Sequence, residues 1–405
     1  MQIVIALGVL LLFPILCLVY SFAGFKKSPS KWKKYFPFYI YFIFALAYSY
    51  TPPAYSNVDL LRYFKIIESL KGLHLYEAVE LLADNLYFEN ILFWIIAQTG
   101  MPHLLPAITT STVYGIGAYI ACDTAKEEDY TFLFRILLTQ AVMIPFFSVV
   151  VNIRNVFAFS LIVLASYLDL YKHKRNIGVL LLYVLPIFMH KTGIIILVLR
   201  VIIPLLKRAY AVALVMIFGL AGLITFAYSH ISLVIIGGAV GEIIRKLIRS
   251  SYSYLLGESQ YAERIRNSLG ATITRYTVFA LLVLMIFFYL KKFRSNKEVA
   301  DIDFMGYLIC IVSLSCNAID TPAYWRFAAT YFLLAPSLLY SFYRKDLFDG
   351  LVNIVLKYLI DIYLVFYFLL QIYRASIDWG STVQTLLFTN AYSILLFLLR
   401  TAFAF

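Results

Sequence analysis

Long apolar runs separated by short basic clusters are the feature that most constrains this chain. A membrane-spanning helix needs about 20 mostly apolar residues, and shorter segments suffice where a helix is broken or buried in protein. Thirteen segments fit this description: 3–24, 36–50, 103–121, 132–151, 155–171, 177–188, 192–206, 210–228, 273–290, 303–318, 327–342, 351–373 and 383–399. We therefore predict an all-α, polytopic integral membrane protein with a single transmembrane domain over residues 1–405. The runs are continuous rather than alternating, which excludes an outer-membrane β-barrel.

Composition excludes several other classes of protein. The chain is 62% hydrophobic and 14% charged, whereas an average soluble domain is about 25% charged. This excludes a soluble enzyme and a disordered chain. The net charge of +12 comes from clusters between the apolar runs rather than from one basic face, so we expect no nucleic-acid partner. No CxxC motif or Cys/His cluster indicates a disulfide scaffold or a metal site among the four cysteines, Cys17, Cys122, Cys310 and Cys316.

The basic clusters also predict the orientation in the membrane. No basic residue precedes the first apolar run, and Lys26–Lys34 follow it, so the N-terminus is expected outside and residues 25–35 inside. A cleaved signal peptide has the reverse order. With 13 spans the C-terminus lies inside, and so do the other clusters: Lys172–Arg175, Lys207–Arg208, Lys291–Lys297 and Arg344–Lys345. This agreement requires residues 177–206 to form a helical hairpin with its tip near Pro186–Lys191.

Two larger segments, 51–102 and 229–272, are expected at the outer face. Apolar residues from Leu60 to Leu82 recur at near-helical spacing, which predicts a helix lying on the bilayer surface. Segment 86–100 is expected to be interfacial or re-entrant. Segment 242–268 is basic on the side where the positive-inside rule does not favour it, which indicates an anionic ligand. Its cations are Arg245, Lys246, Arg249, Arg264 and Arg266.

Polar residues at membrane depth are costly, so they are functional candidates. In a helix, Asp59 and Arg62 would pair at i, i+3. This stretch, which continues to Tyr63, is either a helix start or an acid near a sugar hydroxyl with an arginine aimed at phosphate. Arg154, between Asn152 and Asn155 in a tight link, is either an anion site or an arginine reaching to the head groups.

Two further candidates lie at expected helix ends on the outer face. His190, followed by Lys191, is a candidate general base, phosphate donor or ordinary cap at the hairpin tip. Arg326, in the stretch that starts at Asp320, is either an interfacial anchor or a phosphate ligand. Asp301-Ile-Asp303 has the form of a metal-binding DxD motif, but it follows a basic cluster on the inner side and predicts a helix N-terminus instead.

A resemblance to a known family rests on residues 152–200 and on the outer residues around Asp59. In the first block an Ile-Arg opens a helix, a Lys/Arg cluster follows about 20 residues later, and Phe-Met-His then opens another apolar helix. Further along, Arg326 precedes Phe-Ala-Ala-Thr-Tyr-Phe. This pattern resembles the EpsG family of Wzy-type polysaccharide polymerases, which are multi-pass proteins of the bacterial inner membrane.

The resemblance implies a GT-C-like fold and a glycosyltransferase that joins repeat units of O-antigen, capsule or exopolysaccharide at the outer face. The donor oligosaccharide is carried on undecaprenyl pyrophosphate and moves en bloc to the next lipid-linked repeat. The chemistry uses neither a nucleotide sugar nor a metal, and no cofactor is expected. A flippase and a chain-length regulator are the expected protein partners, alongside the lipid bilayer.

The leaving group in such a reaction is a pyrophosphate, which cations must hold. We expect the catalytic residues to be Arg154, His190 and Asp59. His190 is expected to act as the general base, and Asp59 either competes for that role or orients His190. The expected substrate-binding residues are Arg62, Tyr63, Asn152, Lys191, Arg245, Arg249, Arg264 and Arg326. The alternatives are a lipid-linked oligosaccharide flippase or transporter, an O-antigen ligase, a membrane O-acyltransferase and a structural subunit.

Overall fold

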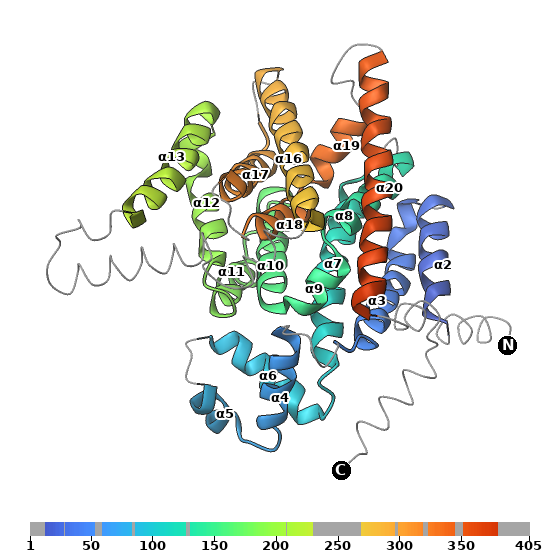
Figure 1. The fold of residues 1–405 in the computed structure, drawn as a ribbon, viewed down its shortest axis with the longest axis vertical. Coiled ribbons are helices and arrows are strands. Elements are labelled where there is room, and N and C mark those ends of the chain that lie inside the picture. The colour runs from blue at the N-terminus through green and yellow to red at the C-terminus, as the bar shows by residue number, and fades with distance from the viewer. Residues whose placement is uncertain are drawn as a thin grey trace, which may run out of the picture. The chain divides into compact units, whose positions relative to one another are not determined.

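The computed structural model is helical, and no strand occurs in the part of the chain that it describes (Figure 1). The described residues are 13–27, 29–52, 59–82, 86–126, 130–207, 209–229, 269–295, 299–318, 323–344 and 351–379. The chain divides into two compact units, Met1–Ile194 with Phe332–Phe405 and Ile195–Tyr331. Each unit is described by itself below.

The first unit holds most of the helices. They are α2 (Pro14–Lys27), η1 (Pro29–Lys31), α3 (Trp32–Tyr48), α4 (Asp59–Ser69), α5 (Leu75–Leu82), α6 (Tyr87–Thr99), α7 (Leu104–Thr124), α8 (Tyr130–Met143), α9 (Phe146–Val151), α10 (Ile153–Leu170), α11 (Ile177–Val184), η3 (Leu185–Phe188), α19 (Pro336–Arg344) and α20 (Leu351–Trp379). The second unit holds α13 (Tyr210–Ser229), α16 (Leu269–Ser295) and α17 (Asp301–Ala318). The boundaries between the units cut through α12 (Gly193–Leu206) and α18 (Tyr324–Leu334).

Three of the described helices are long and apolar enough to cross a membrane: α7, α10 and the Arg275–Arg294 part of α16. At 1.5 Å per residue, a helix of 20 residues spans about 30 Å, which is the thickness of the hydrocarbon core. Shorter apolar helices cover Phe132–Met143, Ile177–Phe188, Gly193–Leu206 and Tyr210–Gly219. The protein is therefore a helical membrane protein, while the count of 13 spans and the outward N-terminus stay predictions.

Proline breaks two segments that the sequence predicted as single helices. Segment 132–151 divides into α8 and α9 at Pro145, and segment 327–342 divides into α18 and α19 at Pro336. Proline has no N–H and its ring clashes with the preceding turn, so the helix ends before it. At the first break the Tyr114 hydroxyl of α7 donates a hydrogen bond to the Ile144 carbonyl. This contact satisfies an acceptor that the broken helix leaves free.

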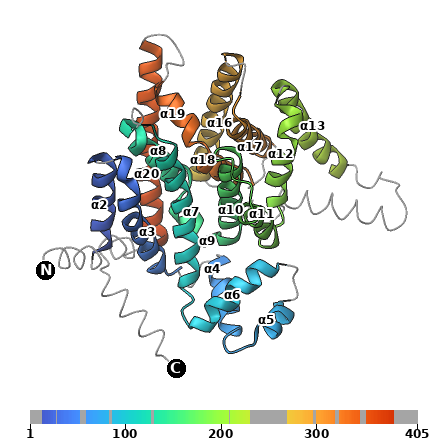
Figure 2. The same ribbon diagram turned by 180° about the vertical axis from the view of Figure 1, so that it is seen from behind.

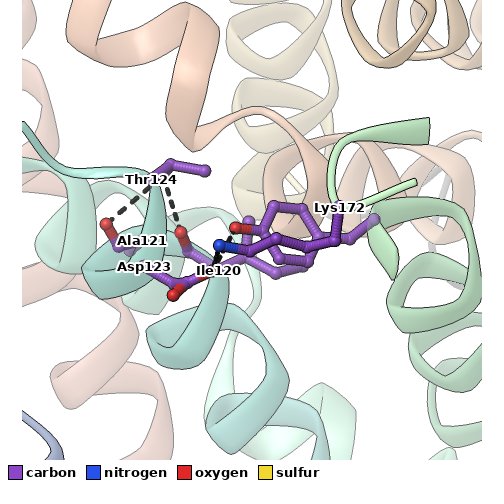
Figure 3. Close-up of polar contacts among 6 residues, drawn as sticks. Ile120, Ala121, Asp123, Thr124 and Lys172 are labelled. Atoms are coloured by element: carbon purple, nitrogen blue, oxygen red, sulfur yellow. Dashed lines mark hydrogen bonds and ion pairs between the residues drawn. The ribbon is translucent and has the colours of Figure 1, made fainter. Parts of the chain in front are cut away.

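Helices α7 and α10 pack together and run parallel. Their N-terminal and C-terminal ends therefore define two opposite ends of the first unit. At their N-terminal ends both contact α4, because the His103 and Phe64 rings lie 4.9 Å apart and Arg154 of α10 lies over the Tyr63 ring. At their C-terminal ends the Lys172 ammonium reaches the Asp123 carboxylate at 2.6 Å (Figure 3). Figure 3 also shows Thr124 bonding back to the last turn of α7.

The basic clusters of the first unit gather at the Asp123 end. Trp32, next to Lys31 and Lys33, lies 5.8 Å from the Tyr119 ring near the end of α7. Tyr343, next to Arg344, stacks at 6.0 Å on Phe132 at the start of α8. Asp59, Arg62 and Arg154 lie at the opposite end. This arrangement is the one expected from the charge pattern if the basic end faces the cytoplasm.

In the second unit, basic residues also gather at one end. Lys207 pairs with Asp301 at 2.6 Å, and Lys292 pairs with Asp303 at 2.7 Å. Both aspartates lie in the first turn of α17, which confirms that Asp301-Ile-Asp303 is a helix N-terminus. Lys207 and Lys292 therefore share one end of this unit, as predicted for the clusters to which they belong.

Segment 51–102, which was predicted at the outer face, contains α4, α5 and α6, and Figures 1 and 2 show these helices together beside the N-terminal ends of α7 and α10. The single helix predicted from Leu60 to Leu82 is wrong. Gly72 adopts φ +77° between α4 and α5, a conformation that glycine reaches at little cost. Helix α6 has 13 residues and is too short to span the core, which fits an interfacial or re-entrant segment. Residues 230–268 of the other segment predicted at the outer face lie outside the described residues.

The predicted hairpin tip is also a helix break. Helix α11 passes into η3, and helical structure stops between Met189 and Thr192. The His190 N–H donates to the Pro186 carbonyl at 2.9 Å, and the Gly193 N–H donates to the His190 carbonyl at 2.9 Å.

Candidate functional site

Helix α4 places Asp59, Arg62 and Tyr63 within its first turns. The acid at the first position is favourable, because negative charge stabilises the positive end of the helix dipole. An Arg62 Nη2 atom lies 3.2 Å from Asp59 Oδ1, and the two side chains are 55% and 42% exposed. The ion pair expected from the i, i+3 spacing is thus confirmed. Since both members are exposed, it contributes only about 0–1 kcal/mol to stability.

Tyr63 forms the floor of the site. Its side chain is buried, and the Phe93 ring lies 5.3 Å from its own. The Arg62 guanidinium carbon lies 5.4 Å from the centre of the Tyr63 ring, and that of Arg154 lies 5.5 Å from it. Both distances are those of cation–π contacts. Since both contact the same ring, the two guanidinium carbons lie no further apart than twice 5.5 Å.

Burial also keeps the Tyr63 phenol neutral. Loss of solvent raises the pKa of Tyr63 to about 12, although the positive charge of Arg154 opposes this rise. The ring therefore meets the two arginines as an uncharged aromatic face at physiological pH.

Arg154 lies at a sharp junction between two helices. Helix α9 ends at Val151, α10 begins at Ile153, and Asn152 alone joins them with φ −102° and ψ 50°. The Asn152 side-chain amide donates to the Ser148 carbonyl at 3.0 Å, which fixes the junction. Arg154 is consequently held in the first turn of α10. A cation is unfavourable at that end of a helix dipole, so the position calls for a negative partner.

That partner is Glu89 of α6. An Arg154 Nη1 atom lies 3.3 Å from Glu89 Oε2, and the side chains are 27% and 4% exposed. Glu89 is not among the site residues predicted from the sequence. The available signal was an acid inside the apolar stretch LYFENILFWIIAQTG, where a charged group is costly unless it is paired.

Two asparagines follow the members of this ion pair in the sequence. Asn90 and Asn155 are 2% and 7% exposed. Within the described part of the chain, neither Asn90 Nδ2 nor Asn155 Oδ1 has a hydrogen-bond partner. Buried polar atoms are nearly always hydrogen-bonded in folded proteins, so these two are exceptions to the usual pattern.

His190 lies at the same end of the first unit as Arg154. It packs beside α10, next to residues that follow Arg154 in that helix. The imidazole is buried, and its Nδ1 atom is hydrogen-bonded to the Thr192 hydroxyl. The ring packs edge-on against Phe159 with centroids 5.8 Å apart. Phe159 follows Arg154 by five residues, which is about 7.5 Å along a helix and a different face of it. Lys191 is exposed.

The structure therefore brings together four of the residues predicted from the sequence and adds a fifth. We use "arginine cluster" for Asp59, Arg62, Tyr63, Glu89 and Arg154. His190 lies beside the second turn of α10 rather than next to the Arg154 guanidinium. Arg245, Arg249, Arg264 and Asp320 lie outside the described residues.

Comparison with protein families identifies the relatives of this chain. The model of the EpsG family matches residues 54–387, which include the whole arginine cluster. The chain belongs to the EpsG family. This is a family of Wzy-type polysaccharide polymerase-like membrane proteins, associated with glycosyltransferase-like polymerase activity. No curated protein and no solved structure matches the chain.

Two other arginines of this EpsG-family chain lie in the second unit. Arg326 is half-buried in the first turn of α18, and its N–H donates to the Ala323 carbonyl at 3.1 Å. Arg275 of α16 donates from Nη2 to the Asn317 carbonyl at 2.6 Å, and the Asn317 amide donates to the Arg275 carbonyl at 3.3 Å. Arg275 is not among the site residues predicted from the sequence.

Within the described ranges, no group of three or more His, Cys, Asp or Glu side chains gathers closely enough to hold a metal ion. The polar groups of the arginine cluster are two guanidiniums, two carboxylates and a phenol. Guanidiniums bind phosphate oxygens bidentately and stay charged at any physiological pH. The two guanidiniums are therefore the groups of the cluster suited to a phosphorylated anion.

Proposed function

We propose that this EpsG-family protein is a glycosyltransferase that polymerises lipid-linked oligosaccharide repeat units at the outer face of the bacterial inner membrane. The donor is an oligosaccharide on undecaprenyl pyrophosphate, and it moves en bloc to the next lipid-linked repeat. The observation that carries the proposal is the arginine cluster, where two guanidiniums lie over one buried tyrosine at the end of two membrane-length helices.

The position of the cluster suits a lipid pyrophosphate. Lys172 and the other basic clusters of the first unit lie at the opposite end of α7 and α10. Since basic loops favour the cytoplasmic side, the arginine cluster then faces outward. A polyprenyl pyrophosphate places its charged head at the membrane surface, which is the depth at which helices of this length end.

The arginines then act on the leaving group. Negative charge develops on the pyrophosphate as the glycosidic bond to the donor sugar breaks, and Arg62 and Arg154 stabilise it. Preorganised donors of this kind are often the largest catalytic contribution, and loss of one costs about 10²–10³ in rate. Asn152, Lys191 and Arg326 are proposed to bind the rest of the donor, together with the basic segment that holds Arg245, Arg249 and Arg264.

Activation of the acceptor hydroxyl requires a general base. Asp59 lies in the arginine cluster and is 42% exposed, so an acceptor can reach it. His190 is buried against Phe159. We therefore assign Asp59 as the base and give His190 a supporting place beside α10. The variant Asp59→Asn is expected to lose polymerisation, and His190→Ala is expected to keep most of it. The opposite result would reverse the assignment.

Reconstitution distinguishes the polymerase from the alternatives. Purified full-length protein in proteoliposomes receives the lipid-linked repeat pool extracted from a host strain that lacks this protein. A polymerase forms lipid-linked dimers and longer chains and releases undecaprenyl pyrophosphate. A flippase moves the lipid across the bilayer without changing glycan length, and a ligase elongates only when another acceptor lipid is added. Either of these outcomes would reject the proposal.

The partners and the sidedness have tests of their own. Co-purification from host membranes would detect the proposed flippase and chain-length regulator. Reporter fusions at residues 60, 154 and 190 are expected to place all three on the outer side. A divided result would contradict the orientation.

A further inference from the structure

We propose that Glu89 is a positioning residue: its buried carboxylate fixes the Arg154 guanidinium at the place where the pyrophosphate binds. This inference rests on the proposed function, because it assigns the reason why one particular arginine of the cluster acts on the leaving group. Glu89 is not among the site residues that the sequence motifs predict.

The burial of the two groups gives the pair a direction. The Glu89 side chain is 4% exposed and that of Arg154 is 27% exposed, so the carboxylate lies inside and the guanidinium faces the surface. A guanidinium has five N–H donors. Among the described residues, Arg154 spends only Nη1 on a hydrogen bond, and its acceptor is Glu89. Its Nη2 and Nε groups remain for an incoming anion.

Two further contacts restrict the same guanidinium. The Tyr63 ring lies 5.5 Å from its carbon and closes one side. The tight junction at Asn152 fixes the backbone from which Arg154 extends. Glu89 lies in the first turn of α6, where negative charge is favoured by the helix dipole. The outer segment thus supplies the carboxylate, and the membrane helix supplies the arginine.

Arg62 provides the contrast. Its carboxylate partner Asp59 is 42% exposed and its own side chain is 55% exposed, so water competes for both. Exposed ion pairs of this kind restrict the positions of their side chains only weakly. Of the two arginines over Tyr63, Arg154 is therefore the preorganised one, and Glu89 is what makes it so.

The consequence for the reaction is a loss of rate rather than of substrate binding. Glu89→Gln keeps the side-chain volume and an acceptor oxygen but removes the charge that orients Arg154. A displacement of about 1 Å in a positioned catalytic group costs on the order of 10²-fold. Because the charge on the leaving group is largest in the transition state, we expect kcat to fall about 10–100-fold with little change in KM.

The chain offers a matched control in Asp169. This carboxylate is 8% exposed and lies 3.3 Å from Arg175 Nε, near the opposite end of α10. Asp169→Asn therefore removes the charge of a similarly buried carboxylate at the other end of the same helix, although its partner Arg175 is 74% exposed. It is expected to leave kcat unchanged, so it separates the loss of a buried carboxylate from an effect on Arg154.

The experiment measures kcat and KM in nanodiscs with the lipid-linked repeat pool, for wild type, Glu89→Gln, Glu89→Asp and Asp169→Asn. Glu89→Asp retains the charge, so it is expected to recover part of the lost kcat. If Glu89→Gln matches Asp169→Asn in kcat, or changes only KM, the positioning role is wrong. Where Glu89→Gln does not fold, Glu89→Asp decides: a wild-type kcat in that variant also rejects the role.

Arg154→Ala separates this inference from the proposed function. If Arg154→Ala abolishes polymer formation while Glu89→Gln leaves kcat intact, the positioning role fails and the polymerase stands. If wild type forms no polymer, or Arg154→Ala retains full activity, the proposed site itself fails. Binding of undecaprenyl pyrophosphate, with undecaprenol as the uncharged control, reports whether Arg154 recognises the pyrophosphate without any sugar.

Discussion

Removal of Arg154 should destabilise the protein as well as inactivate it, and a second substitution should undo only the first effect. In Arg154→Met the Glu89 carboxylate loses the cation 3.3 Å away while it remains in a site where it is 4% exposed. Breaking a buried ion pair from one side costs about 3–5 kcal/mol, because the remaining buried charge loses the opposite charge that compensated it. The 27% exposure of Arg154 places this pair near the lower end of that range. Loss of the cation–π contact with Tyr63 adds about 0.5–1 kcal/mol.

The double variant Glu89→Gln/Arg154→Met tests the origin of that cost. It replaces the buried charge by a neutral amide, so the free energy of unfolding should recover by about 2 kcal/mol over the single variant. Polymerisation should stay absent, because no guanidinium is restored. The assay is unfolding in mixed detergent micelles, followed by intrinsic fluorescence, together with the polymerisation assay in nanodiscs.

The stability of Arg154→Met also shows whether the ion pair is buried. If Arg154→Met costs less than about 1 kcal/mol, the pair behaves as a surface ion pair and Glu89 carries no buried charge. A double variant no more stable than the single one would lead to the same conclusion.

Three further predictions concern the scaffold and use the same unfolding measurement. Tyr114→Phe removes the hydroxyl that satisfies the carbonyl at the α8–α9 break and should cost about 1–3 kcal/mol; no loss would show that water replaces it. Gly306→Ala places a methyl group against the Tyr289 hydroxyl and should cost about 1–3 kcal/mol, whereas Gly219→Ala meets nothing within 4 Å and should not destabilise; equal effects would contradict the packing. Burial lowers the pKa of His103 below its ordinary value of 6.5, so the folded protein binds this proton less readily than the unfolded chain. The free energy of unfolding should therefore fall as pH drops below about 6.5, less steeply in His103→Asn, and an unchanged slope in that variant would exclude His103 as the cause.

Charge patterning and helical spacing predicted much of the site. The Asp59–Arg62 pair depends only on an i, i+3 spacing, which a sequence displays directly. The gathering of basic residues at one end within each unit followed from counting the apolar runs between the basic clusters. Arg154 was visible because a permanently charged side chain between two apolar runs requires a reason.

The parts that were missed depend on long-range contacts or on the weight given to a single residue. Glu89 becomes a candidate site residue only through its contact with Arg154, 65 positions later, and the spacing of residues in a sequence cannot show that contact. The place of His190 depends on the rotation of α10, which a motif does not fix. Pro145 and Gly72 were visible in the sequence, but hydropathy outweighed their effect on the backbone.

The glycan profile of a deletion strain, resolved by polymer length on a gel, shows whether the protein polymerises repeat units and whether Arg154 is needed for it. The strain is complemented with wild type or with Arg154→Ala. We expect that wild type restores a ladder or high-mass polymer and that the variant leaves a single repeat unit on the surface. The claim is contradicted if deletion leaves polymer length intact, or if deletion removes even the single repeat unit from the surface.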